Sequence, residues 1–191
     1  MTTVAATAPP GRRGGRWVLV PLTVAAFVAV AVGLVARSQS TPDGEAQGTY
    51  IEAFFSDPIH MKAWLATAAV VLACFQVFTA SWIYGRVPFR RSRRVNVAHR
   101  WSGRLLFLTT LPVAYHCLFR LGYQGGDDRV LWHSLLGCAF FGAFAAKVSI
   151  VRLRRFPVWV LPTAGGLTFA VLIGIWYTSA YWFFDLVGVG L

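Results

Sequence analysis

Five long apolar runs, separated by short polar or charged segments, make up most of the chain. They cover residues 17–36, 61–85, 97–121, 130–151 and 156–184. A helix rises about 1.5 Å per residue, so each run can cross a hydrocarbon core about 30 Å thick. The pattern therefore predicts an all-α membrane protein with five transmembrane helices. Because short connections make successive spans antiparallel neighbours, we expect residues 58–186 to form a four-helix transmembrane bundle.

Charged residues are sorted between the two sides that this pattern defines. All seven Asp and Glu residues fall in segments on one side, together with only four of the 18 basic residues: Arg37, Lys62, Arg120 and Arg129. The other basic residues fall in segments on the opposite side, which includes the N-terminus. Cytoplasmic segments of membrane proteins are rich in Lys and Arg. We therefore expect a multi-pass protein of the plasma membrane, with a cytoplasmic N-terminus and the C-terminus outside.

The composition also indicates a lipid environment. Apolar and aromatic residues (AVILMFWYC) make up 57% of the chain, charged residues only 13%, and the mean hydropathy is +0.58. Soluble domains have about a quarter of their residues charged. The net charge of +11 would suggest nucleic acid as the partner of a soluble protein. Here topology explains where the charges lie, so we expect the partner to be the lipid bilayer and not nucleic acid.

The N-terminal segments are predicted to lie apart from any functional site. Residues 1–16 are basic and rich in Pro, Gly and Ala, which is typical of a disordered cytoplasmic tail. Run 17–36 is too long for the apolar part of a secretory signal, and a poor cleavage site follows it, so we interpret it as a retained anchor helix. Its only polar side chain is Thr23. We therefore expect the helix to be peripheral to any cofactor site.

Three of the four histidines lie within the third and fourth apolar runs. Polar side chains are costly in the bilayer core, and neutral imidazole is the commonest nitrogen ligand of metals, including haem iron. His99 begins the third run at the cytoplasmic face, beside Arg100 and Arg104. His116 follows after 17 residues, or about 25 Å, and the two do not share a helix face. Pro112 is expected to kink the helix just inside His116.

His133 lies about one turn into the fourth run, at nearly the same depth as His116. Gly137 follows on the same helix face and would leave room there for a flat ligand of His133, or would serve helix packing alone. A bis-histidine haem b needs two imidazoles at one depth on facing helices. Equal depth favours the pair of His116 and His133, whereas diagonal placement of the second and fourth spans favours His60 and His133. Both pairs remain open at this point.

Three stretches of the chain resemble a known family. Residues 59–86, with a histidine near the start and a Tyr-x-Arg end, are similar to the second span of eukaryotic-type cytochrome b-561. HRWSGR (99–104) and LWHSLLG (131–137) resemble the haem regions of that family's third and fourth spans. The resemblance to cytochrome b-561-like and ferric-reductase-like membrane haem proteins covers about residues 58–155.

The resemblance implies a haem between His60 and His133 on the non-cytoplasmic side, and His99 as half of a cytoplasmic pair. The family's fifth-span histidine has no counterpart in the stretch FPVWVLPTAGG (156–166), so one haem b is expected. HRWSGR also resembles the His-Arg-x-x-Gly turn in membrane anchors of succinate dehydrogenase, which lies near a quinone. Arg100 and Arg104 are thus candidates to hold an anionic or quinone donor.

We therefore expect a membrane b-type cytochrome that passes electrons from a cytoplasmic-side donor, a quinol or a redox partner protein, to an acceptor at the outer face. It would act as a transmembrane oxidoreductase or an electron-transfer subunit. The alternative is a cofactor-free membrane scaffold or assembly subunit, whose histidines pair with backbone or lipid. The three cysteines lie at no metal-binding spacing and are interpreted as small buried apolar side chains: Cys74, Cys117 and Cys138.

Overall fold

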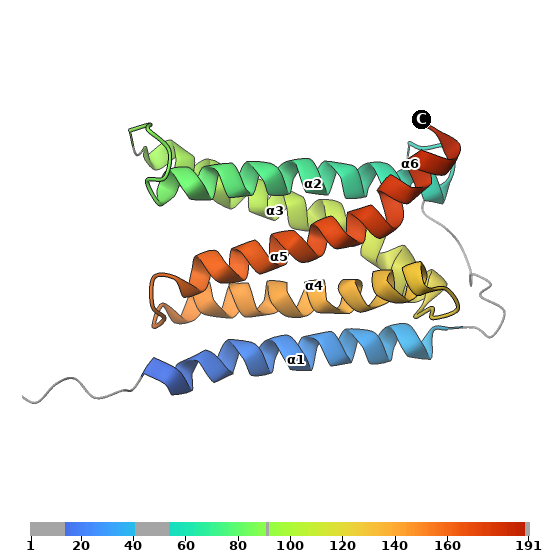
Figure 1. The fold of residues 1–191 in the computed structure, drawn as a ribbon, viewed down its shortest axis with the longest axis horizontal. Helices are drawn as coiled ribbons and strands as arrows, with labels where there is room; N and C mark the ends of the chain where they lie inside the picture. Colours follow the sequence, from blue (N-terminus) through green and yellow to red (C-terminus); the bar gives the residue numbers. More distant parts are fainter. Residues whose placement is uncertain (1–13, 41–53, 91, 190–191) are drawn as a thin grey trace, which may run out of the picture.

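The computed structural model describes residues 14–40, 54–90 and 92–189 (Figure 1). These residues form helices and no strand, as expected for an all-α protein. In chain order the elements are α1 (Gly14–Ser38), α2 (Pro58–Ile83), α3 (Arg93–Tyr115), the π-helical turn η1 (His116–Leu121), α4 (Asp128–Leu153), α5 (Val160–Trp176), the π-helical turn η2 (Tyr177–Tyr181) and α6 (Trp182–Val187).

The boundaries differ from the predicted ones at both ends of the first span. Residues 14–16 of the predicted tail belong to α1, and the rest of that tail lies outside the described residues. A helix keeps its backbone hydrogen bonds for about a turn beyond its apolar run, because the backbone groups still need partners there. The same reasoning applies at Ser38, two residues past the predicted end of the run.

The start of α2 follows the signals in the sequence. The Asp57 Oδ1 atom accepts hydrogen bonds from the backbone N–H groups of Ile59 and His60 at 2.7 and 2.9 Å, and Pro58 takes the first helical position. Asp57 is therefore the N-cap of α2, and an acidic cap followed by proline is a recognisable sequence signal for the start of a helix. The hydrogen bond from the His60 N–H is the main cause that holds the pKa of the Asp57 carboxyl below its ordinary value.

One apolar core at the middle of the molecule takes a buried side chain from each of four helices: Ala73, Leu106, Phe140 and Leu172. α2 packs along α3 and also contacts α5, and α4 packs along α5. α3 and α4 meet through side chains, since the rings of Phe107 and Phe144 stack with their centroids 4.8 Å apart. The helices that carry His60 and His133, α2 and α4, therefore do not pack along each other.

The first helix lies at the edge of the molecule, where it packs closely against one other long helix. α1 packs along α4 (Figure 1). A Cβ atom at Gly142 would lie 2.5 Å from the carbonyl oxygen of Ala25 and 3.1 Å from the Cβ atom of Ala29, so the two backbones approach as closely as glycine permits. Small residues of this kind are what bring membrane helices together.

Among the described residues, four helices are long and apolar enough to cross a membrane: Trp17–Ser38, Pro58–Ile83, Asp128–Leu153 and Val160–Val187. By length and composition they suggest a multi-pass membrane protein. α3 does not join them, because its first twelve residues carry four arginines, at positions 93, 94, 100 and 104. The fifth span therefore stays a prediction.

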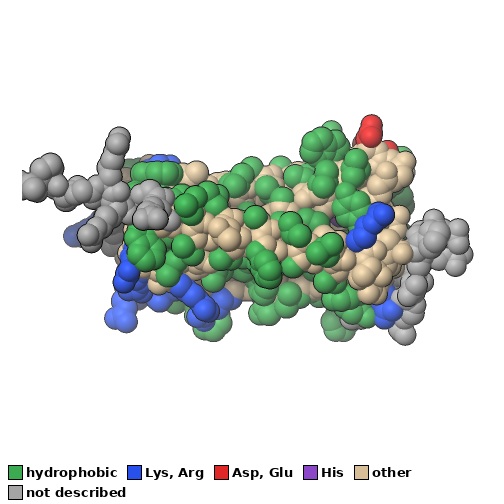
Figure 2. Space-filling view, turned by 90° about the horizontal axis from the view of Figure 1, so that it is seen from below, with side chains coloured by type: hydrophobic (Ala, Val, Ile, Leu, Met, Phe, Trp, Pro, Cys, Tyr) green, Lys and Arg blue, Asp and Glu red, His purple; other side chains and the backbone are tan. Residues whose placement is uncertain are grey.

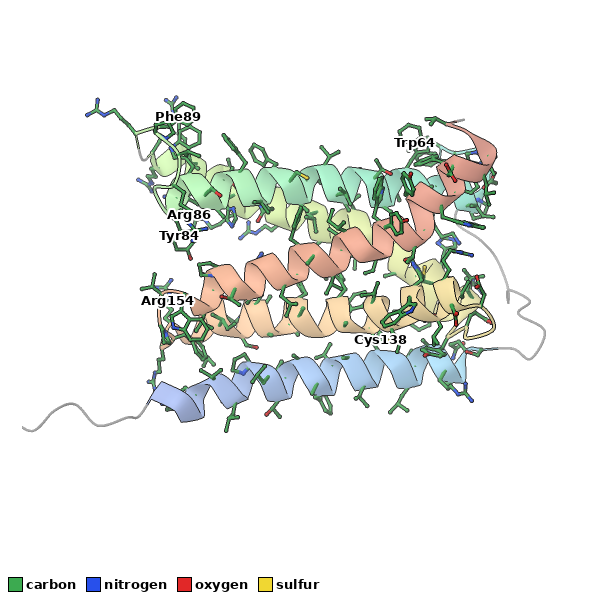
Figure 3. The ribbon with its side chains drawn as sticks, in the orientation of Figure 1. Trp64, Tyr84, Arg86, Phe89, Cys138 and Arg154 are labelled. Atoms are coloured by element: carbon green, nitrogen blue, oxygen red, sulfur yellow. The ribbon has the colours of Figure 1, made fainter. Side chains whose placement is uncertain are left out.

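Charged side chains gather at the two ends of the molecule, and the surface between them is largely apolar (Figure 2). One end, here called the basic end, carries the α2–α3 loop with Arg86 and the α4–α5 loop with Arg154 (Figure 3). The opposite end, here called the acidic end, carries the acids of the described residues: Asp57, Asp127, Asp128 and Asp185. Folding thus brings together the basic segments that the sequence separates.

The predicted kink in the third span takes the form of a π turn. α3 continues through Pro112, and η1 begins four residues later at His116. Pro112 has no N–H with which to bond the carbonyl of Leu108, which loosens the regular helical hydrogen bonding there. The fifth predicted span is likewise interrupted by η2, which no proline accompanies. Both π turns lie in the half of the molecule toward the acidic end.

Candidate functional site

A cavity of about 340 Å³ lies between the helices in the half toward the acidic end. It is lined by residues of α2, α3, η1, α4, α5, η2 and α6, by the loop between η1 and α4, and by Ala36 of α1. Its lining is largely apolar, which suits a ligand with an apolar body. Both π turns contribute, with Cys117 and Leu118 from η1 and with Thr178 and Ala180 from η2. Such turns within helices occur frequently at functional sites.

His133 is the one histidine of the described residues that lines this cavity. Its Nδ1 atom lies 3.2 Å from the Thr178 hydroxyl oxygen. That hydroxyl in turn donates to the carbonyl oxygens of Gly174 and Ile175, at 2.9 and 3.1 Å. Since the threonine proton goes to a carbonyl, the oxygen accepts from Nδ1–H of His133. The neutral ring then carries a lone pair on Nε2, which is the form that binds a metal.

Open space lies beside His133 on the same helix. A Cβ atom at Gly137 would meet no atom within 4 Å, and Gly137 itself lines the cavity. Cys138, the next residue, lines the cavity too and lies on α4 in Figure 3. The room that the sequence predicted for a flat ligand of His133 is therefore present in the fold.

His60 lies next to the cavity without lining it. Its Nδ1 atom is 2.5 Å from Asp57 Oδ2, so the ring is tied to the N-cap of its own helix. The other side of the ring packs edge-on against Phe183, with the centroids 5.0 Å apart, and Phe183 does line the cavity. The neighbours of His60 that face the cavity are Ile59 and Lys62. The structure therefore does not bring His60 and His133 together.

His116 is completely buried but faces away from the cavity. Its exposed fraction is 0%, and its Nδ1 atom donates a hydrogen bond of 2.8 Å to the carbonyl oxygen of Pro112. The cavity is instead lined by its neighbours Val113 and Cys117. The pair of His116 and His133, favoured by equal depth, is thus not formed either. Equal depth was a poor guide because it ignores rotation about the helix axis.

His99 belongs to a separate polar cluster toward the basic end. Its Nδ1 atom lies 2.8 Å from the Thr79 hydroxyl oxygen. The Gln76 side chain donates from Nε2 to the His99 carbonyl oxygen at 2.5 Å and to the Ser102 hydroxyl at 2.6 Å. Lys147 of α4 is close enough to act electrostatically on the ring. Sequence reasoning had identified His99 but not the α2 side chains that hold it.

The two arginines beside His99 stay at the surface of the basic end. Arg100 donates from Nε to the carbonyl oxygen of Asn96 at 3.3 Å, and the guanidinium of Arg104 lies 4.8 Å from the centre of the Trp101 ring. Neither residue lines the cavity. Any role they have with a donor is therefore separate from the His133 site.

Two basic residues of the cavity were missed from the sequence. Lys62 of α2 and Arg129 of α4 both line it. Arg129 donates to the carbonyl oxygen of Thr178 at 2.8 Å, and its guanidinium carbon lies 3.7 Å from the centre of the Trp182 ring. The signal was present in the sequence, since each is one of only four basic residues on the side that holds all the acids.

The described residues include no cluster of three His, Cys, Asp or Glu side chains that could hold a metal ion by themselves. All three cysteines are free thiols. Cys117 and Cys138 line the cavity, but Cys74 is exposed, so its expected burial was wrong. In a membrane helix the outward face is apolar too, because it meets lipid, and an apolar sequence does not reveal which face is inside.

Comparisons with known proteins identify a family whose function is unknown. No curated protein and no solved structure matches the chain. The model of one family, described as a family of unknown function (DUF6529), matches residues 18–191, which include every described helix in whole or in large part. The chain therefore belongs to the DUF6529 family.

Proposed function

We propose that this protein is a membrane b-type cytochrome that holds one haem in the cavity and carries electrons across or within the plasma membrane. The resemblance of residues 58–155 to cytochrome b-561-like membrane haem proteins supports this function. In the proposal α3 and η1 form a fifth span, the basic end faces the cytoplasm, and the acidic end faces outside. The cavity then lies in the outer half of the membrane.

The observation that carries the proposal is the position of the His133 ring and its hydrogen bond. It faces an apolar cavity, its Nδ1–H is held by Thr178, and the space next to it at Gly137 is open. A histidine that ligates a metal almost always donates its other N–H to a neighbouring acceptor. These residues fit a haem whose iron is bound by Nε2 of His133.

His60 is the second axial ligand in this proposal. Its helix, α2, stands opposite α4, and the ring already contacts the cavity-lining Phe183. The Asp57 carboxylate accepts from Nδ1 of His60, which leaves Nε2 available as a ligand. Since His60 does not line the cavity, its side chain has to turn toward the cavity when the haem binds.

A bound haem would supply one-electron chemistry. The chain itself contributes a largely apolar cavity and the Thr178 hydroxyl, which accepts a hydrogen bond from Nδ1–H of His133 and so orients the ring and raises its basicity as a ligand. The donor in this proposal is a quinol or a redox partner protein at the basic end. The polar cluster of His99, Thr79 and Gln76, with Arg100 and Arg104 nearby, supports that location.

The test is the absorption spectrum of the full chain purified from haem-replete cells. Reduced protein should show b-type bands that correspond to about one haem per chain, because one imidazole lines one cavity. A folded, monodisperse and colourless preparation would contradict the cytochrome function. That result would favour the second candidate, a cofactor-free scaffold or assembly subunit.

A further inference from the structure

Lys62 is a basic residue on the wall of the apolar cavity, and no acidic side chain of the described residues balances its charge there. It lies near the start of α2, is half-buried, and lines the cavity opposite the α4 wall. Among the described residues no Asp or Glu lines the cavity, and no hydrogen bond or ion pair reaches the Lys62 side chain. A charged amine in such a place is costly unless a partner neutralises it.

Arg129, the other basic residue of the lining, already has partners. It donates to the Thr178 carbonyl oxygen, stacks on Trp182, and lies 3.7 Å from the Asp127 carboxylate. Lys62 is therefore the basic group of the lining that the fold leaves for a ligand. Lys62 lines the same cavity as His133 of α4 and Cys117 of η1, so the three side chains border one interior.

We propose that Lys62 recognises the carboxylate end of an amphipathic ligand in this cavity and sets its orientation, with the acidic groups toward the acidic end of the bundle. The assignment rests on the proposed function, and for haem the groups that Lys62 pairs with are the propionates. The apolar body of the ligand would lie beside Gly137, where the space is open. A neutral ligand of the same shape would leave the amine without a partner and should bind more weakly.

The experiment compares haem with its dimethyl ester, in which both propionates are uncharged. Full-length protein prepared free of haem is titrated with each in the same detergent, and binding is followed by the Soret absorbance. Wild type should bind haem more tightly than the ester by about tenfold or more, since a charge-assisted pair in an apolar site contributes on this order. Lys62→Met should bind haem as weakly as it binds the ester, and Lys62→Arg should restore the preference.

The chain offers a matched control, because Lys147 is its only other lysine. Lys147 is also half-buried but does not line the cavity, so Lys147→Met should keep the wild-type preference. Equal binding of haem and ester by wild type would overturn the Lys62 assignment and leave the proposed function standing, as would an unchanged preference in Lys62→Met. If folded wild type bound neither compound, the proposed function would fail and the assignment with it.

Discussion

At the scale of single residues, two histidines in opposite halves of the molecule make the same kind of hydrogen bond to a threonine. His133 donates from Nδ1 to Thr178, and Nδ1 of His99 lies against Thr79 in the same way. Each threonine hydroxyl donates a hydrogen bond to the carbonyl oxygen four residues earlier. The distance between the two oxygen atoms is 2.9 Å for Thr178 and 2.8 Å for Thr79. Both imidazoles are therefore set with a lone pair on Nε2. Of the two, only His133 lines the cavity described above.

Removing the threonine that orients His133 should weaken haem binding without unfolding the protein. Thr178→Val keeps the size of the side chain and removes the acceptor, and loss of such a partner typically costs about 10- to 100-fold in affinity. His133→Ala should abolish binding, because the ligand itself is gone. Titration of haem-free protein with haem measures both effects.

The matched control for this prediction is Thr79→Val, which removes the same hydrogen bond at the basic end. It should leave haem affinity unchanged, and so should His116→Ala, since His116 faces away from the cavity. His60→Ala should retain a weakly held haem that has lost its low-spin spectrum. If His116→Ala instead removed the low-spin spectrum, His116 would be the second axial ligand.

At the scale of the helices, two glycines of α4 have opposite surroundings. Gly142 permits close contact with α1, whereas Gly137 leaves space in the cavity. Both lie in one helix whose sequence is apolar on every side, so only the packing tells them apart. The sequence allowed Gly137 to serve either a ligand or helix packing, and it did not show that Gly142 packs against α1.

Leucine at these two positions should therefore fail in different ways. Gly142→Leu has to push α1 away from α4, because a Cβ atom there already meets the Ala25 backbone, and it should lower the free energy of unfolding by about 1–3 kcal/mol. Gly137→Leu should leave the thermal unfolding temperature close to that of wild type and prevent haem binding by filling the cavity. Thermal unfolding and haem titration of both variants measure this. Equal unfolding temperatures for the two would contradict the packing of α1.

At the scale of the whole molecule, charge is divided between the two ends, and this division is the basis of the proposed orientation. The basic loops gather at one end and the described acids at the other (Figures 1 and 2). α3 and η1 together connect the two ends, and the arginines of α3 reduce its hydropathy. Long basic side chains near the end of a span can reach the interface, which makes such a helix compatible with crossing.

Cysteine labelling on either side of α3 tests the topology. In a chain whose three native cysteines are replaced, Gly126→Cys should react with a membrane-impermeant maleimide added to intact cells, and Phe89→Cys should not. Both positions are exposed, so accessibility within the fold does not limit the reaction. Permeabilised cells should label both. Labelling of Phe89→Cys in intact cells would exclude the proposed orientation, and failure of both to label would exclude α3 as a span.

The sequence by itself determined the features that depend on local order along the chain. These are the long apolar helices, the N-cap at Asp57 followed by Pro58, and the separation of acidic and basic segments. Each of them follows from neighbouring residues or from their spacing. It also indicated His133 and the room at Gly137, since positions four residues apart share a helix face.

Only the tertiary structure decided which residues face the cavity. A helix in lipid is apolar on all sides, so the sequence does not show how it is rotated about its axis. That rotation turns His60 and His116 away from the cavity and turns Lys62 toward it. The π turns η1 and η2 add to this, because each inserted residue rotates the helix face that follows. The place of α1 against α4 was hidden for the same reason: contacts between small residues carry no polar signal in the sequence.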